Sequence, residues 1–231
     1  MINAKLFHYV NHSKLSSLID LCKSINQIKQ THANLITTAQ ITLPVIANKF
    51  LKNVALVSLT YAHKLFDQIP QRDLFIYNTM IKAHSLSNHS YRDSIAVFQS
   101  LIRDSGYFPN RYSFVFAFGA CGNGMCVWEG EQVFTHAVKV GLDGNVFVVN
   151  ALIGMFGKWG NVEDARKVFD SAVDRDLYSW NTMIGAYVGS GNMIQSKELF
   201  DEMHERDVVS WSTIIAGYVQ VLQSLESKID K

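Results

Sequence analysis

The chain has 231 residues, of which 48% are hydrophobic and only 3 are proline, a composition that excludes a disordered or collagen-like chain. Its formal net charge is +1, but residues 1–73 carry eight Lys or Arg against three acids, whereas residues 177–231 carry four against seven. No uninterrupted apolar run reaches the length of about 18 residues that a membrane span needs, so we expect a soluble protein.

The N-terminal part of the chain is basic, with no acid before Asp20. Lys5, Lys14 and several Ser and His residues give residues 1–14 a weak resemblance to an organelle targeting segment, although the usual arginine is missing. An ordinary first helix explains the same residues equally well. Residues 15–73 follow, with one segment around LIDLCKSINQIKQTHANLI and a second over 44–73.

The three cysteines, Cys22, Cys121 and Cys126, are too few and too irregularly spaced for a disulfide framework. Four residues separate Cys121 from Cys126, where a zinc knuckle has two. We therefore expect a reducing compartment, no metal site and no cofactor.

From residue 64 onward, two short phrases recur. The first is YNTMIKAH from Tyr77, WNTMIGAY from Trp180 and WSTIIAGY from Trp211, the last two 31 residues apart. The second is KLFDQIPQRD at 64–73, KVFDSAVDRD at 167–176 and ELFDEMHERD at 198–207, and each copy ends directly before a new unit starts. A fixed period of this length indicates a repeat architecture.

Each unit has the pattern of a helical hairpin. Within 177–207, Met183, Ile184 and Tyr187 share one helical face, the stretch GSGN at 189–192 interrupts the pattern, and an apolar face resumes with Leu199 and Phe200. Two helices this short cannot bury their apolar faces alone, so neighbouring hairpins must stack. The sequence therefore predicts an all-α fold, an α-solenoid.

These phrases resemble the pentatricopeptide repeat family, in particular the plant PLS type that mixes repeats of different lengths, over about residues 15–219. The resemblance implies a right-handed solenoid of stacked helix-turn-helix repeats. The implied division is a targeting or N-terminal segment at 1–14, two degenerate repeats in 15–73, repeats at 74–110, 111–145, 146–176 and 177–207, and a partial repeat with a tail at 208–231. Leu222 replaces the expected inter-helix glycine, which indicates a naturally short or truncated member.

The resemblance also implies binding of single-stranded RNA, one base per repeat. In the family, the fifth residue of the first helix and the last residue of the repeat contact the base edge, and the second residue wedges between successive bases. The implied base-reading residues are Asn78, Asn110, Asn150, Asp176, Asn181 and Asp207. The implied wedge residues are Phe75, Tyr112, Phe147, Tyr178 and Val209, and the aromatic excess among them suits stacking on bases.

A carboxamide offers both a donor and an acceptor, so it can face the mixed edge of a pyrimidine. As the family code implies, C over U is favoured by Asn78 with Asn110, and U is favoured by Asn150 with Asp176 and by Asn181 with Asp207. Val115, the fifth residue in 111–145, cannot hydrogen-bond, so the implied register is 5′-C/U, any, U, U-3′, parallel to the chain. The two aspartates also stand where a helix N-cap is favoured, which is a competing structural role.

Catalytic motifs are missing from the sequence. It has no phosphate-binding loop, no H-E-x-x-H zinc pair, no G-x-S-x-G elbow, and neither element of the deaminase-like extension that many relatives carry. We expect a non-enzymatic factor of mitochondria, or alternatively of chloroplasts, that selects a site in an organellar RNA for editing, processing or stabilisation by partner proteins.

Two other functions remain open. Helical-hairpin solenoids also bind peptides, so a protein-interaction scaffold without RNA specificity is the alternative, and a non-functional remnant is a third because few bases would be read. The short last unit also predicts self-association. Its first helix, expected over Trp211–Leu222, would have little second helix to cover it, so Ile214, Ile215 and Tyr218 would be partly bare.

Overall fold

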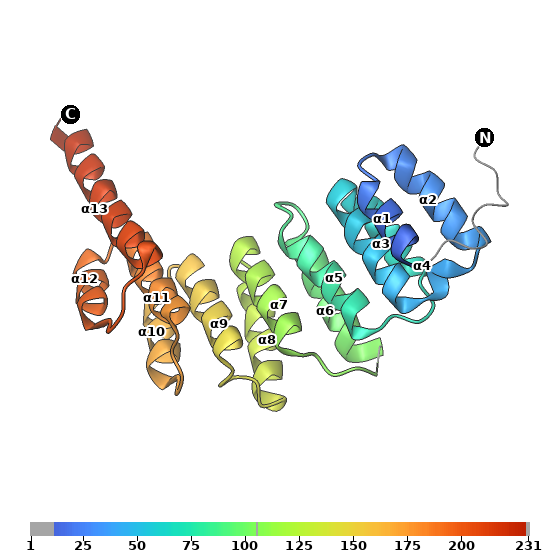
Figure 1. The fold of residues 1–231 in the computed structure, drawn as a ribbon. Helices are drawn as coiled ribbons and strands as arrows, with labels where there is room; N and C mark the ends of the chain where they lie inside the picture. Colours follow the sequence, from blue (N-terminus) through green and yellow to red (C-terminus); the bar gives the residue numbers. More distant parts are fainter. Residues whose placement is uncertain (1–11, 105, 230–231) are drawn as a thin grey trace. The chain divides into compact units, whose positions relative to one another are not determined.

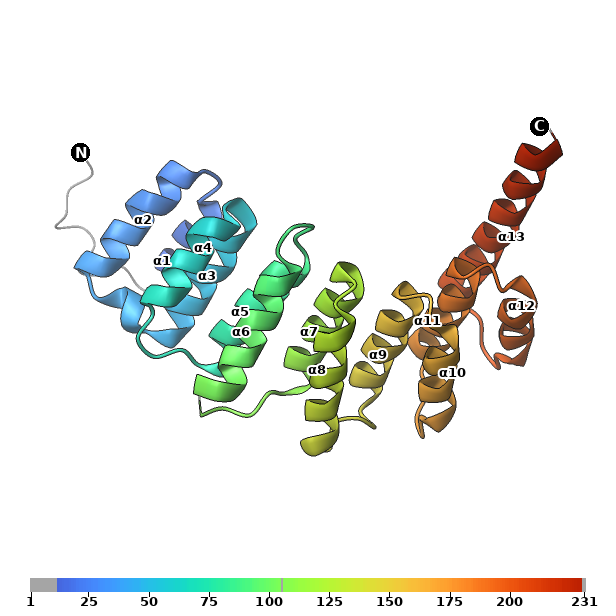
Figure 2. The same cartoon turned by 180° about the vertical axis from the view of Figure 1, so that it is seen from behind.

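The computed structural model describes residues 12–104 and 106–229. These residues form α-helices and one short 3-10 helix, and no strand occurs among them (Figures 1 and 2). The chain divides into two compact units, Met1–Pro109 and Asn110–Lys231. The predicted all-α fold of stacked helical hairpins is confirmed.

The first unit contains α1 (His12–Leu21), α2 (Ile25–Thr37), the 3-10 helix η2 (Gln40–Thr42), α3 (Pro44–Val57), α4 (Leu59–Gln68), α5 (Leu74–Ser85) and α6 (Tyr91–Asp104). Helices α1, α3 and α5 contact one another in succession, and α4 packs on both α3 and α5. Phe50, Ile76 and Phe98 are fully buried in this unit. Most of the expected targeting segment at 1–14 lies outside the described residues, and its last three residues begin α1.

The second unit contains α7 (Arg111–Gly124), α8 (Val127–Lys139), α9 (Val146–Lys158), α10 (Val162–Ser171), α11 (Leu177–Gly189), α12 (Met193–Glu202) and α13 (Val208–Ile229). The first helices α7, α9, α11 and α13 contact one another in succession, and the second helices α8, α10 and α12 each pack on the first helix before them. Helices begin at 74, 111, 146, 177 and 208, the residues at which the sequence analysis places the repeat starts.

Two glycines close the turns between the helices of the last complete hairpins. Gly160 and Gly191 have φ angles of 73° and 78°, in the left-handed region where glycine carries no steric penalty. The next backbone N–H then reaches back into the helix: Asn161 N donates to Phe156 O at 3.0 Å, and Asn192 N donates to Tyr187 O at 2.9 Å. These turns fold each second helix back onto its first helix.

Helices α9, α11 and α13 share one continuous apolar cluster with α10 and α12. Phe169 and Phe200 are buried in it, and Phe200 belongs to the apolar face predicted for α12. Trp180 packs edge-on against Phe169 with ring centroids 5.1 Å apart, and Trp211 packs against Phe200 at 4.8 Å. Trp211 nevertheless remains 53% exposed, so only one side of this ring belongs to the core.

The last helix corrects two expectations. It extends over Val208–Ile229 and not over Trp211–Leu222, because no glycine or proline follows Gly217 and the residues after it are good helix formers. Ile214 was expected to be partly bare, but it is buried because it joins the apolar cluster formed with α11 and α12. Ile215 and Tyr218 are exposed.

The segment Val208–Glu226 of α13 has the length and apolar composition of a helix that could cross a membrane, and 17% of it is buried. Serines and glutamines interrupt the apolar residues of this segment, so it contains no continuous apolar run. Ser210 and Ile214 are buried, and the helix contacts α11 and α12. A solenoid helix with one covered face therefore explains the same composition.

Candidate functional site

Asn150 and Asp176 meet at the starts of two successive first helices. Asn150 is the fifth residue of α9, and Asp176 directly precedes α11. The Nδ2 atom of Asn150 donates to Oδ1 of Asp176 at 3.2 Å. The side chain of Asn150 is buried, and its Oδ1 accepts no hydrogen bond from the described residues. The pair therefore contains a buried acceptor without a protein donor.

The next repeat contains the same arrangement. Asn181, the fifth residue of α11, donates from Nδ2 to Oδ1 of Asp207 at 3.1 Å. Its own Oδ1 is also buried and receives no donor from the described part of the chain. Both amide–carboxylate pairs join residues 26 apart in sequence, so each pair forms only when two consecutive hairpins stack.

Both aspartates also cap helices. Asp176 Oδ1 accepts from Ser179 N at 2.8 Å and from Ser179 Oγ at 2.9 Å. Asp207 Oδ1 accepts from Ser210 N at 2.8 Å and from Ser210 Oγ at 2.7 Å. The N-cap role is therefore real. The bonds from the serines and from the two asparagines all use Oδ1 of the aspartates.

Hydrogen bonding keeps both carboxylates ionised. Desolvation raises the pKa of Asp176, but the hydrogen bonds from the backbone and side chain of Ser179 and from Asn150 outweigh it, and the pKa is lowered. The pKa of Asp207 is lowered by the backbone N–H and the hydroxyl of Ser210 and then by Asn181. Near neutral pH each pair consequently presents a charged, acceptor-only carboxylate beside an amide.

The third expected pair, Asn78 with Asn110, is divided between the two units. Asn78 lies half-buried on α5 of the first unit. Asn110 begins the second unit and caps α7, where its Oδ1 accepts from Tyr112 N at 3.1 Å and from Ser113 N at 3.2 Å. The pairing of these two asparagines stays a prediction. In the intervening repeat, Val115 is half-buried on α7 and offers no hydrogen-bonding group.

The five expected wedge residues occupy the second position of α5, α7, α9, α11 and α13, and all are exposed. Their exposed fractions run from 47% for Tyr112 to 71% for Phe75. Large apolar side chains that are exposed at the same position of successive helices are typical of a binding surface rather than of random surface composition. Their contact with bases stays a prediction.

Comparisons with known proteins identify the repeat. The family model described as "PPR repeat" matches residues 147–177 and 178–208. A pentatricopeptide repeat-containing protein of Arabidopsis thaliana, described as chloroplastic/mitochondrial, is 32% identical over 171 residues, which are 72% of this chain and 27% of the relative. A second Arabidopsis thaliana member, described as chloroplastic, is 33% identical over 171 residues, or 72% of this chain and 23% of the relative. The chain belongs to the pentatricopeptide repeat family.

The chain spans about a quarter of the length of these curated relatives. Among solved structures, the pentatricopeptide repeat protein PPR10 from maize aligns with 95% of this chain and 38% of its own, at 15% identity and a TM-score of 0.47. A second structure of PPR10, in complex with an 18-nt psaJ RNA element, aligns with a TM-score of 0.42 at 15% identity, over 95% of this chain and 40% of its own.

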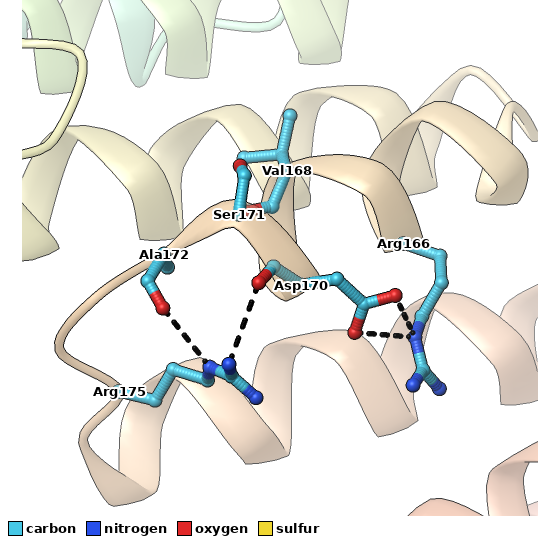
Figure 3. A network of polar contacts seen from close by, with 6 residues as sticks. All are labelled: Arg166, Val168, Asp170, Ser171, Ala172 and Arg175. Atoms are coloured by element: carbon cyan, nitrogen blue, oxygen red, sulfur yellow. Dashed lines mark hydrogen bonds and ion pairs between the residues drawn. The ribbon is translucent and has the colours of Figure 1, made fainter.

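An arginine holds the end of the second helix next to each of the two pairs. Arg175 Nε donates to the carbonyl of Ala172 at 3.2 Å, and its terminal nitrogen donates to the carbonyl of Asp170 at 3.4 Å (Figure 3). Its Cζ lies 5.0 Å from the ring centroid of Phe169. These bonds satisfy carbonyls that the end of a pentatricopeptide helix leaves unpaired. Arg175 thus fixes the backbone immediately before Asp176.

The same contact recurs in two other repeats. Arg206 donates to the carbonyl of Asp201, the equivalent of Asp170, at 2.8 Å and stacks on the Phe200 ring at 4.9 Å. Arg72 donates to the carbonyl of Ile69 at 3.2 Å and stacks on Phe66 at 4.5 Å. The repeated Arg-Asp dipeptide thus combines a helix-closing arginine with a helix-capping aspartate.

Asn48 and Asp73 were not among the predicted site residues. Asn48 is the fifth residue of α3 and Asp73 caps α5, so they hold the same positions as Asn150 and Asp176 in an earlier repeat. The Oδ1 of Asn48, however, accepts from Thr79 Oγ1 at 2.6 Å, and no bond joins it to Asp73. Both residues line a pocket of about 620 Å³ together with Lys49 and Lys52. The Arg-Asp ending at 72–73 was the signal that could have revealed them.

The cysteines are free and buried. Burial raises the pKa of the Cys121 thiol to about 12, so this group stays protonated and unreactive at neutral pH. Within the described ranges, no group of three or more His, Cys, Asp or Glu side chains is placed to hold a metal ion. The expectation that the protein uses no metal, no cofactor and no catalysis stays a prediction.

Proposed function

We propose that this pentatricopeptide repeat protein binds single-stranded RNA and that the pairs Asn150–Asp176 and Asn181–Asp207 each read a uracil. The observation that carries the proposal is the orphaned acceptor: in both pairs the asparagine Oδ1 is buried without a protein donor. Leaving a buried acceptor unpaired costs about 1–3 kcal/mol, and a ligand that supplies a donor recovers this free energy.

The preference for uracil follows from the donors and acceptors of the bases. Uracil presents an N3–H donor between two carbonyl acceptors, whereas the corresponding nitrogen of cytosine is an acceptor. The N3–H of uracil satisfies the asparagine Oδ1 in each pair. Cytosine N3 would instead oppose an acceptor, and the ionised aspartate beside it offers no proton.

The remaining positions complete the proposed recognition. The wedge residues Phe75, Tyr112, Phe147, Tyr178 and Val209 pack on successive bases, and stacking on the four aromatic ones contributes about 1–3 kcal/mol per base. Asn78 with Asn110 reads C or U and the repeat 111–145 reads no base, which gives the register 5′-C/U, any, U, U-3′. The repeat lengths support assignment to the PLS type.

We propose the mitochondrion as the compartment, with the chloroplast as the alternative, and the names of the two Arabidopsis relatives support an organelle. In this proposal the protein is a non-enzymatic site-recognition factor for editing, processing or stabilisation of an organellar transcript. The chemistry is supplied by partner proteins.

The test compares two short labelled RNAs, one with the predicted register and one with purines at its three read positions. Wild type should bind the first RNA at least about tenfold more tightly, since each satisfied base contact is a net gain of about 0.5–1.5 kcal/mol. Asn150→Ala and Asn181→Ala should each reduce this preference. Asn161→Ala is the matched control, because Asn161 caps the second helix α10 through Asp164 N and lies outside both pairs.

Equal binding of the two RNAs by wild type would overturn the coded mode and favour the protein-interaction scaffold.

One specific observation favours a protein contact in addition: Ile215, Tyr218, Leu222 and Leu225 are exposed on α13. We propose that this apolar face mediates self-association. Light scattering should show a molecular mass that rises with protein concentration, and Leu222→Lys should abolish the rise.

A further inference from the structure

Arg111 bridges two of the wedge residues. It is the first residue of α7, and its Cζ lies 4.9 Å from the ring centroid of Tyr112 and 5.0 Å from that of Phe147, the second residue of the next first helix α9. Its terminal nitrogen also donates to the hydroxyl of Tyr112 at 3.1 Å. A guanidinium within about 6 Å of an aromatic centroid is held by a cation–π contact, and this one contacts two rings at once.

This arginine is unusual among the five first helices that begin a repeat from residue 74 onward. The corresponding residues of the others are Leu74, Val146, Leu177 and Val208. The two rings that Arg111 contacts are 47% and 49% exposed, whereas Phe75 and Tyr178, at the same position of other repeats, are 71% and 66% exposed. The lower exposure is consistent with the guanidinium covering part of each ring.

The bridge lies in the repeat that cannot read a base. In the proposed binding mode, the base held by repeat 111–145 stacks between the wedge residues Tyr112 and Phe147. The fifth residue of this repeat is Val115, so a base in this slot would gain stacking but no edge contact. A planar guanidinium stacks on the same ring faces and carries a positive charge that a base lacks.

We infer that Arg111 fills the base slot of repeat 111–145. The guanidinium acts as an internal substitute for a nucleobase, so the RNA crosses this repeat with its phosphate paired to Arg111 and with its base left outside. The inference rests on the proposed function, because it assigns the repeat a backbone contact within the same RNA site. If Arg111 fills the slot, the second nucleotide of the register needs no base at all, whereas an unread slot would still accept any base.

Abasic RNAs test the inference. Four RNAs of the predicted register are compared: intact, abasic at the second nucleotide, abasic at the third and abasic at the fourth. Wild type should lose less than about twofold in affinity at the second nucleotide but at least about fivefold at the third and fourth, where stacking and edge contacts are both lost. Arg111→Ala opens the slot, so an abasic second nucleotide should now cost about fivefold.

The Arg111→Lys variant separates charge from slot filling. A lysine keeps the phosphate contact but lacks the planar stacking group, so its salt dependence should match wild type while its abasic profile resembles Arg111→Ala. The slope of log K against log salt should fall by about 0.7 in Arg111→Ala alone. Lys139→Ala is the charge-matched control on the second helix α8, with no effect on the abasic profile.

Two results would overturn the inference. If wild type binds the register RNA and loses as much affinity from the abasic second nucleotide as from the third, the slot holds a base. The stacked arginine also has a signature that needs no RNA: the δ-CH2 protons of Arg111 should show an upfield ring-current shift by NMR, and Tyr112→Leu with Phe147→Leu should abolish it. An unshifted signal would refute the bridge itself, whereas a shifted signal with no RNA binding would refute the proposed function and the RNA role of Arg111 together.

Discussion

Replacing Asp176 by asparagine or by alanine separates its two roles, because it both caps α11 and pairs with Asn150. Asparagine is as good an N-cap as aspartate, and its side-chain oxygen can still accept from Ser179 N and Asn150 Nδ2. The main loss is the charge of the acceptor, so Asp176→Asn should change the free energy of unfolding by no more than about 1 kcal/mol. The fold of the repeat should be retained.

Alanine removes both roles. Loss of the cap costs about 1 kcal/mol, and the buried Nδ2 of Asn150 would lose its acceptor at a further cost of about 1–3 kcal/mol. Asp176→Ala should therefore lower the free energy of unfolding by about 2–4 kcal/mol in urea titrations followed by circular dichroism. A much smaller loss would show that the observed hydrogen bonds contribute little to stability.

The base preference should respond to the asparagine variant in the opposite way. Its amide introduces an N–H donor where the carboxylate had only acceptors, so cytosine N3 gains a partner. In fluorescence anisotropy with four RNAs that differ only at the third nucleotide, Asp176→Asn should shift the preference from U toward C. Asp207→Asn should make the same shift at the fourth nucleotide only. If the base profile of Asp176→Asn equals that of wild type, the aspartate is a helix cap and nothing more.

Three further predictions concern the solenoid. An alanine Cβ at Gly157 would lie 2.8 Å from the neighbouring first helix, whereas Gly185 has open space, so Gly157→Ala should be less stable than Gly185→Ala by about 1–3 kcal/mol in urea unfolding; equal stabilities would contradict the close helix approach. Arg175→Ala should cost about 1–2 kcal/mol because two helix-end carbonyls and a ring lose their partner, while Arg103→Ala, which breaks an exposed ion pair with Asp104, should cost less than about 1 kcal/mol; a reversed order would exclude the arginine contact as the stabilising feature. The cap aspartates have lowered pKa values, so their contribution to stability is fully present above the unfolded-state pKa of about 3.9 and is lost as pH falls through the folded-state pKa. Unfolding should accordingly be insensitive to these groups between about pH 5 and 8, and the double Asp→Asn variant should lose less stability than wild type on acidification below about pH 4.

The sequence was sufficient to predict the helical hairpins because the period, the turn glycines and the capping residues are local signals that agree with one another. The helix starts at 146 and 177 follow directly from the repeated phrases. The pair Asn150–Asp176 was accessible for the same reason, since fixed spacing in a stack places equivalent residues at equivalent distances.

Features that depend on neighbouring side chains could not be predicted in the same way. The burial of Ile214 requires knowing how far α12 covers α13, and the bond from Thr79 to Asn48 depends on the relative rotation of α3 and α5. Arg111 reaches across to another helix, and no period encodes the direction of a long flexible side chain. Such contacts are individual to one repeat, whereas a repeat pattern reports only what the repeats share.

In the proposed function, the pairs Asn150–Asp176 and Asn181–Asp207 couple hairpin stacking to RNA recognition. Asn150 belongs to one hairpin and Asp176 begins the next, so the amide–carboxylate pair exists only while the two are packed together. Arg175 stacks on Phe169, and Phe169 packs on Trp180 of the following helix, so the backbone before Asp176 is tied to the same interface. A base that binds the assembled pair must therefore stabilise that interface by the free energy of its own binding. RNA should consequently strengthen packing most between the hairpins that flank a uracil-reading pair and least across repeat 111–145, which lacks one.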